Sequence, residues 1–323
     1  MSRTVAVADI GGTHARFALA QVEQGRVTSL GEPVTLKTGE FSSFRTAWEE
    51  FARQSGGPLP DALGMAFAGP VDGDVLKLTN NPWVIRPSAM EEMLQVRDFR
   101  IVNDFGAIAH AVADLGDDQF AHICGPDVPL PRSGVTTIIG PGTGLGVAQL
   151  LTTGTHTSVI ETEGGHVDFA PLDSIEDQIL IHLRRSFRRV SVERVASGAG
   201  LANIYNAIAA IEGKSIMPPE DKALWTAALD GSDALAAAAL DRFCLSLGAV
   251  AGDLALAHGA NGVVVAGGLG YRLRDHLHTS GFNDRFIAKG RFERRMEAIP
   301  VKLVIHPQPG LYGAAAAFAR AFA

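Results

Sequence analysis

One pattern occurs twice in the sequence and constrains the fold more than any other feature. An apolar run at residues 4–10 is interrupted by a glycine–threonine turn at 11–13 and resumes at 16–20. A second apolar run at residues 135–139 is interrupted by a glycine-rich turn at 140–144 and resumes at 145–151. Each pattern predicts a β-hairpin. Their repetition indicates two related halves, each beginning with a hairpin.

Strands and helices are expected to alternate after the first hairpin. Extended segments are predicted at residues 27–36, 62–68 and 99–103, and helices at 44–51 and 105–115. The first helix is amphipathic, because Phe44, Ala47, Trp48 and Phe51 recur at helical spacing after the capping candidates Ser42 and Ser43. This alternation predicts an α/β fold.

The second half continues the alternation. Helices are predicted at residues 173–189, 234–258 and 310–323, and a strand at 263–265. Gly259 is expected to end the long middle helix, and the strand leads directly into Gly267 and Gly268. At 323 residues, the chain exceeds the size at which a single core usually stops growing. Two domains are therefore expected.

Composition and charge exclude several classes of protein. With 46% hydrophobic and 20% charged residues, the chain can form a sizeable core. Its net charge of −7 provides no basic field for nucleic acid, and the arginine-rich segment 184–189 is interpreted as the polar end of a helix. Only two cysteines occur, without zinc-ligand spacing, and no unbroken apolar stretch is long enough to span a membrane. We expect a cytoplasmic protein that binds neither nucleic acid nor membrane.

The first glycine turn has the chemistry of a phosphate site. Asp9 ends a buried strand, and Gly11, Gly12 and Thr13 follow with backbone N–H groups that no Cβ shields. Taken alone, this is equally an ordinary hairpin turn. A second such loop contains Gly142, Thr143 and Gly144, and a third turn contains Gly267 and Gly268. No GxxxxGK[ST] loop occurs, and no GxGxxG in the right context, so neither a P-loop nor a Rossmann site is predicted.

Together these motifs resemble the sugar kinases of the actin, Hsp70 and hexokinase superfamily, and within it the bacterial glucokinase family. The matching segments are DIGGTHAR at 9–16, NDF at 103–105, GTGLG at 142–146, EGGHVDFAP at 163–171 and ERVASG at 193–198. The similarity extends from Ala8 to near Gly313. It implies a two-lobed actin-like (ribonuclease H-like) α/β fold, with a cleft between a small domain of residues 1–105 plus 307–323 and a large domain of residues 106–306.

The resemblance also implies a set of site residues. Those expected to bind the hexose hydroxyls are Asn103, Asp104, Glu163, His166 and Glu193, with Asp104 also the catalytic base. Those expected to bind ATP are Asp9, Gly11, Gly12, Thr13, Gly142, Thr143, Gly144, Gly198, Gly267 and Gly268. Asp9 would hold Mg²⁺, through water. Each acidic residue also has a structural alternative: a charged pair on a solvated turn for Glu163 and His166, a first-turn carboxylate for Glu193, and a helix cap for Asp104.

The implied reaction transfers the γ-phosphoryl group of ATP to the 6-hydroxyl of D-glucose, as in the first step of glycolysis, by a protein expected to form a homodimer. The alternatives are a kinase for fructose, mannose or N-acetylmannosamine, a non-catalytic sugar-binding protein and an actin-like ATPase. Two departures from related patterns matter. His14 stands where the family often has Asn, and the cysteine-rich zinc motif of the related repressor and kinase family is missing.

Overall fold

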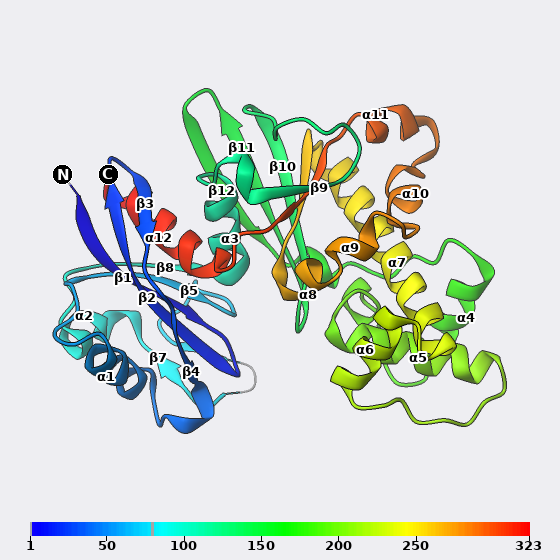
Figure 1. The fold of residues 1–323 in the computed structure, drawn as a ribbon, viewed down its shortest axis with the longest axis horizontal. Coiled ribbons are helices and arrows are strands. Elements are labelled where there is room, and N and C mark those ends of the chain that lie inside the picture. Colours follow the sequence, from blue (N-terminus) through cyan, green and yellow to red (C-terminus); the bar gives the residue numbers. More distant parts are fainter. Residues whose placement is uncertain (1, 79–80) are drawn as a thin grey trace. The chain divides into compact units, whose positions relative to one another are not determined.

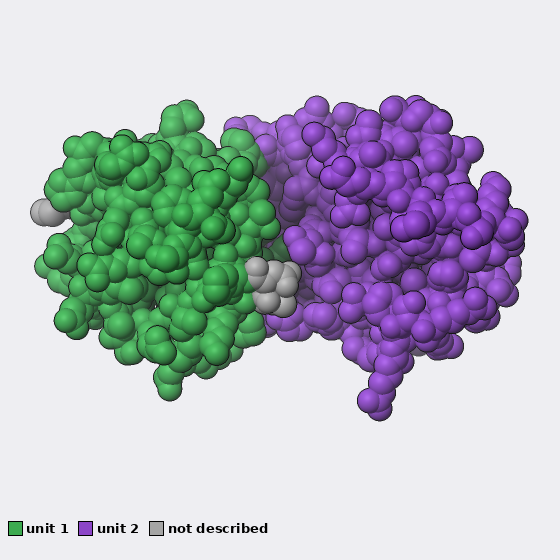
Figure 2. Space-filling model, turned by 90° about the horizontal axis from the view of Figure 1, so that it is seen from below, with its two compact units in different colours: residues 1–116, 306–323 green, residues 117–305 purple. Residues whose placement is uncertain are grey.

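A computed structural model describes residues 2–78 and 81–323. The chain forms two compact units, residues 1–116 with 306–323, and residues 117–305 (Figure 2). The C-terminal helix thus belongs to the same unit as the first hairpin. The helix that follows Asn103 lies wholly in the first unit, whereas the boundary expected after residue 105 passes through it.

The first unit is built on a sheet with strands in the order β3-β2-β1-β5-β8, and β4 pairs with the beginning of β2 (Figure 1). Its strands are β1 (Arg3–Ile10), β2 (His14–Glu23), β3 (Arg26–Leu30), β4 (Val34–Lys37), β5 (Ala62–Phe67), β8 (Asp98–Asn103) and the separate pair β6 (Leu76–Lys77) and β7 (Val84–Ile85). Its helices are α1 (Phe44–Gln54), α2 (Met90–Leu94), α3 (Asp104–Val112) and α12 (Pro309–Ala321), with 3₁₀ turns η1 (Thr38–Glu40) and η2 (Pro87–Ala89). The hairpin β1–β2 is antiparallel, and β1, β5 and β8 are parallel.

Alternating side chains of β1 point into two cores on opposite faces of this sheet. Val5 and Val7 pack in the cluster that includes α12, whereas Ala6, Ala8 and Ile10 pack in the cluster that includes α1. A strand has a side-chain period of two, so a buried strand with apolar residues throughout needs helices on both faces. The rings of Phe17 and Phe51 stack at 5.2 Å between centroids, which confirms the predicted apolar face of α1.

The second unit contains a sheet with strands in the order β12-β11-β10-β13-β14-β9. Its strands are β9 (Phe120–Cys124), β10 (Gly134–Pro141), β11 (Leu145–Thr153), β12 (His156–Thr162), β13 (Gly262–Val265) and β14 (Val301–Val304). Its helices are α4 (Ser174–Leu183), α5 (Gly198–Ile211), α6 (Asp221–Asp230), α7 (Ala234–His258), α8 (Gly267–Arg272), α9 (Arg274–Leu277), α10 (Phe282–Ile287) and α11 (Glu293–Glu297), with 3₁₀ turns η3 (Asp117–Gln119), η4 (Gly164–His166), η5 (Val192–Arg194) and η6 (Gly290–Phe292). An antiparallel ribbon, β12-β11-β10, continues into parallel β13 and β14, as β3-β2-β1 continues into β5 and β8.

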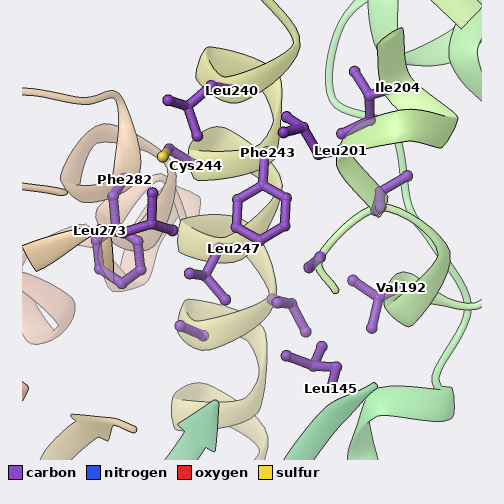
Figure 3. Packing of buried hydrophobic residues seen from close by; sticks show 14 of the residues in the cluster. Leu145, Val192, Leu201, Ile204, Leu240, Phe243, Cys244, Leu247, Leu273 and Phe282 are labelled. Carbon is purple, nitrogen blue, oxygen red and sulfur yellow. The ribbon is translucent and has the colours of Figure 1, made fainter. Parts of the chain in front are cut away.

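The core of the second unit surrounds α7. Figure 3 shows Phe243 and Leu247 of this helix among side chains from α5, α10 and the strand residue Leu145. Phe243 makes an edge-to-face contact with Trp225, with ring centroids 5.3 Å apart. α7 is long and apolar enough to cross a membrane, but 67% of its most apolar window is buried inside this unit. That burial is typical of a core helix.

Most predicted elements are found, with two differences. The predicted extended segment 27–36 is divided into β3 and β4, which pair with successive parts of β2. The predicted helix 173–189 ends at Leu183, so the arginine-rich segment 184–189 lies beyond α4 instead of forming its last turn. Asp173 is the N-cap of α4, and its carboxylate accepts hydrogen bonds from the N–H groups of Ile175 and Glu176. Gly259 ends α7 with a φ of 65°, as predicted.

Replacing Gly313 by Ala should destabilise the first unit. A Cβ at this position of α12 would lie 1.8 Å from the carbonyl oxygen of Ala107 in α3. Because that oxygen belongs to a helix backbone, the two helices must separate, at a cost of about 1–3 kcal/mol. Thermal unfolding measures the effect. Gly57→Ala is the control, since no atom lies within 4 Å of its added Cβ. Equal melting temperatures for the two variants would contradict this packing.

Candidate active site

The predicted site residues of the first unit lie along one edge of its sheet. In the strand register, Ile10 pairs with Phe67 and Phe67 pairs with Asn103. The parallel strands β1, β5 and β8 therefore end side by side, and the turn after β1 lies at the same edge as the residues that follow β8. Carboxyl ends of parallel strands are the usual place for ligand sites in α/β sheets.

The turn at 11–13 is fixed by hydrogen bonds of its backbone N–H and carbonyl groups. The N–H of Gly11 donates to the carbonyl of His14 at 3.0 Å, which closes the turn. The hydroxyl of Thr38 donates to the carbonyl of Gly12 at 2.6 Å, and its backbone N–H donates to the carbonyl of Thr13 at 3.1 Å. Thr38 is 1% exposed, so these bonds are shielded from water.

Asp9 lies within the same edge and is held between a cation and a helix end. Its Oδ2 is 3.4 Å from Nη1 of Arg16, the residue opposite it in the hairpin. Burial raises the pKa of the Asp9 carboxyl, and the charge of Arg16 opposes that rise. A Cβ on Gly310, in the first turn of α12, would lie 2.8 Å from Oδ2. Glycine thus allows the carboxylate to approach a helix N-terminus, where negative charge is favoured.

Asn103 and Asp104 have different structural roles. Asn103 is the N-cap of α3, because its Oδ1 accepts from the N–H groups of Phe105 at 2.9 Å and Gly106 at 3.3 Å. Its Nδ2 donates to the carbonyl of Gly69 at 3.2 Å. Asp104 is the first residue of α3, half-buried, and its Oδ1 accepts from the N–H of Phe105. The capping role considered for Asp104 therefore belongs to Asn103.

In the second unit, three glycine segments meet at the end of β10. The loop 142–144 joins β10 to β11. Gly198, the first residue of α5, donates its N–H to the carbonyl of Gly142 at 2.7 Å. Gly267 has a φ of 83°, and a Cβ there would lie 2.9 Å from the carbonyl oxygen of Pro141. Only glycine fits this combination of positive φ and close approach.

The carboxylate of Glu193 lies against the same loop. Its Oε2 accepts from the backbone N–H of Leu145 at 3.0 Å. A Cβ on Gly144 would lie 2.4 Å from that oxygen. Glu193 is expected to bind the sugar, and the structure shows that it also bonds to the residue after the predicted phosphate loop.

Glu163 and His166 lie at the two ends of the exposed turn η4, which packs on β11. His166 Nε2 is 4.0 Å from Glu163 Oε2, and the two side chains are 56% and 73% exposed. A Cβ on the intervening Gly165 would lie 1.9 Å from the carbonyl oxygen of Leu145. The turn is also held by Arg189, whose Nη2 donates to the carbonyl of His166 at 2.6 Å. The turn that carries Glu163 and His166 therefore packs against the start of β11, directly after the predicted phosphate loop.

Sequence reasoning missed the residues that support these turns: Thr38, Arg189 and Gly310. None has a local motif that marks it, because each acts on residues that are distant in the sequence. His14, noted as a departure, is the first residue of β2 and pairs in register with Lys37. Within residues 2–78 and 81–323, no group of three or more His, Cys, Asp or Glu side chains is arranged to hold a metal ion.

Comparisons with known proteins agree on one family. The glucokinase family model matches residues 6–321. The chain is 61% identical to a glucokinase of Zymomonas mobilis over 97% of each chain, and 38% identical to a glucokinase of Caulobacter vibrioides over 96% of this chain and 94% of the relative. The structure is similar to a crystal structure of glucokinase from an Antarctic psychrotroph, with a TM-score of 0.85, 33% identity and coverage of 97% and 98%. The expected two-lobed actin-like α/β fold is thereby confirmed.

Replacing Asn103 by Ala should destabilise α3, because the N–H of Gly106 loses its acceptor and the N–H of Phe105 keeps only the carboxylate of Asp104. Loss of an N-cap of this kind costs about 1–2 kcal/mol. Asn103→Asp keeps an acceptor at the helix N-terminus and should retain most of that stability. Thermal unfolding of both variants gives the comparison. If N103A melts no earlier than N103D, the capping role is wrong.

Proposed function

The chain belongs to the glucokinase family, and on that premise we propose that it transfers the γ-phosphoryl group of ATP to the 6-hydroxyl of D-glucose. The products are glucose 6-phosphate and ADP, and the reaction is the first step of glycolysis. One observation supports this proposal above the others. Asp104, the predicted base, directly follows β8 and lies at the same edge of the sheet as the glycine turn 11–13. A base and a phosphate-binding turn on one edge suit phosphoryl transfer to a hydroxyl group.

Asp104 is the proposed catalytic base, accepting the proton of the 6-hydroxyl as its oxygen attacks the γ-phosphate. In phosphoryl transfer the attacking and leaving oxygens must be roughly in line, so a base fixed at a helix terminus contributes by position as well as by basicity. Capping by Asn103 leaves the carboxylate of Asp104 in the first turn of α3, where its charge is favoured.

Glucose recognition is assigned to Asn103, Asp104, Glu163, His166 and Glu193. Each glucose hydroxyl both donates and accepts, so a set of carboxylate, amide and imidazole groups matched to them selects one arrangement of hydroxyls. The side chains of Glu163 and His166 are exposed and therefore accessible to a ligand. The backbone of their turn packs closely on β11, which fixes the positions from which the two side chains extend.

The phosphates of ATP are assigned to the two glycine turns. A trans peptide directs its N–H opposite to its carbonyl. Because Thr38 holds the carbonyl of Gly12, the N–H of Thr13 points away from Thr38 and is available to a phosphate oxygen. In the second unit, the loop at Gly142, Thr143 and Gly144 lies beside the N-terminus of α5, where helix N–H groups also favour anions.

Gly198, Gly267 and Gly268 are proposed to flank the adenosine. Gly268 has no atom within 4 Å of an added Cβ, so a ligand can approach its backbone closely. Its neighbour Gly267 holds the start of α8 against the end of β10.

Asp9 is the proposed Mg²⁺ residue, acting through water. Mg²⁺ in kinases is typically held by one or two carboxylates, substrate phosphates and water, and the partly exposed carboxylate of Asp9 beside the turn 11–13 fits this arrangement. The metal would supply positive charge that offsets the charge developing on the phosphates.

The remaining assignments follow the family. We propose that the unit of residues 1–116 and 306–323 is the small lobe and that the unit of residues 117–305 is the large lobe. The protein is proposed to act in the cytoplasm as a homodimer, without nucleic-acid or membrane partners.

A coupled assay tests the reaction and its sugar. With ATP and Mg²⁺, glucose should give the highest kcat/KM among glucose, fructose, mannose and N-acetylmannosamine, and chelation of Mg²⁺ should abolish turnover. Each of the other sugars differs from glucose in a hydroxyl, carbonyl or acetamido group, and that difference leaves a polar group of the protein without its hydrogen-bond partner. Such a loss lowers kcat/KM. A higher kcat/KM for N-acetylmannosamine or fructose would assign the protein to that sugar instead.

Replacing Asp104 by Asn isolates its role as base. Asn is nearly isosteric but cannot accept the proton, so kcat should fall by about 10²- to 10⁴-fold, glucose affinity should fall far less than kcat, and the melting temperature should stay near the wild type. Asp117→Asn, at an exposed aspartate outside the candidate site, is the matched control. A near-normal kcat would exclude Asp104 as the base, and a collapsed melting temperature would favour a structural role.

A further inference from the structure

Glu193, which is assigned to the sugar, contacts the loop that is assigned to phosphate. Its Oε2 accepts from the N–H of Leu145, the residue that follows the loop 142–144. Within the described part of the chain, Oε1 has no hydrogen-bond partner. One oxygen of the carboxylate is therefore used by the protein, and the other remains available to a ligand hydroxyl.

We propose that Glu193 joins the sugar site to the phosphate loop inside the second unit: Oε2 fixes the loop, Oε1 binds a glucose hydroxyl, and Gly144 controls the position of both oxygens. This inference rests on the proposed function, since it takes glucose as the ligand. It adds a specificity role for Gly144, a residue otherwise assigned only to phosphate.

The space for this carboxylate exists only because residue 144 is glycine. An added Cβ would lie 2.4 Å from Oε2 and 3.2 Å from Cδ of Glu193. Atoms at such distances overlap, so one must move. The atoms that a Cβ would overlap are the end of a flexible side chain and not backbone. The carboxylate is therefore displaced, while the backbone of the loop keeps its conformation.

The backbone on both sides of this contact is anchored. The side chains of Leu145 and Val192 are both buried in the α7 core cluster (Figure 3). The N–H of Val192 donates to the carbonyl of Val167 at 2.8 Å, and Gly198 donates to Gly142. With its surroundings fixed in this way, the Glu193 side chain is the part that can yield to a new methyl group.

The coupling has a consequence for glucose binding in the absence of nucleotide. A residue that serves only phosphate has no influence on that affinity. If Gly144 positions Glu193, a methyl group at 144 weakens glucose binding by removing a charge-assisted hydrogen bond, whose loss typically costs tenfold or more in affinity. Glucose affinity measured without nucleotide therefore distinguishes a role of Gly144 in positioning Glu193 from a role in phosphate binding alone.

Calorimetric titration with glucose alone, on the full chain, provides the test. Gly144→Ala should bind glucose about tenfold or more weakly than the wild type, with little change in melting temperature. Gly142→Ala is the matched control, because it adds the same methyl group to the same loop with no atom within 4 Å. Its affinity for glucose alone should equal that of the wild type, whatever its turnover.

A double variant makes the test independent of folding. Glu193→Gln keeps the size of the side chain but removes its charge, and should also weaken glucose binding. Because G144A and E193Q disturb one carboxylate, the double variant should bind glucose no more weakly than the weaker single variant. The inference would be overturned if the loss of glucose affinity in the double variant equalled the product of the two single losses. An affinity of G144A for glucose equal to that of G142A would also overturn it. A wild type that binds no glucose would instead overturn the proposed function.

Discussion

Hydrogen bonds to the carbonyl groups of two glycine turns determine the geometry on which the rest of the site depends. In the first unit the carbonyl of Gly12 accepts from the buried hydroxyl of Thr38, and in the second the carbonyl of Gly142 accepts from the N–H of Gly198. A flexible glycine turn has many conformations of similar energy. Satisfying its carbonyls from neighbouring elements selects one of them and directs the remaining N–H groups outward. Phosphate binding by backbone groups, as proposed for both turns, requires N–H groups of fixed direction.

The two units achieve this by similar means. In each unit the strand before the turn pairs antiparallel with one neighbour and parallel with the other, so it lies in the interior of a mixed sheet. In each unit a helix also begins beside residues of the site: Gly310 of α12 near Asp9, and Gly198 of α5 near Gly142. Glycine at these helix starts permits contacts that a Cβ would prevent. The repeat in the sequence therefore corresponds to a repeated structure, a glycine turn that follows an interior strand of a mixed sheet.

Several site residues also contribute to the stability of the elements that position them. Asn103 caps α3 and thereby orients Asp104, and Glu193 holds the start of β11 next to the loop that it is proposed to serve. Substitution of such a residue removes a structural contact together with the proposed ligand contact. Asp104 differs, since the cap of its helix is supplied by its neighbour. Its proposed chemical role is consequently separable from folding by a conservative change.

The sequence by itself determined the α/β class, both glycine hairpins, the apolar face of α1 and α7 with its glycine end, because these follow from local periodicity and from residues with special backbone conformations. Family motifs also predicted which residues form the site. Only the tertiary structure decided that α4 ends at Leu183, that Asn103 and not Asp104 caps α3, and that Thr38 and Gly310 support the first site edge. The contact between Glu193 and Leu145 likewise joins residues that are 48 positions apart. Such contacts have no local signature, since they arise when sheet register and helix packing bring distant segments together, and a sequence pattern records only what neighbouring residues share.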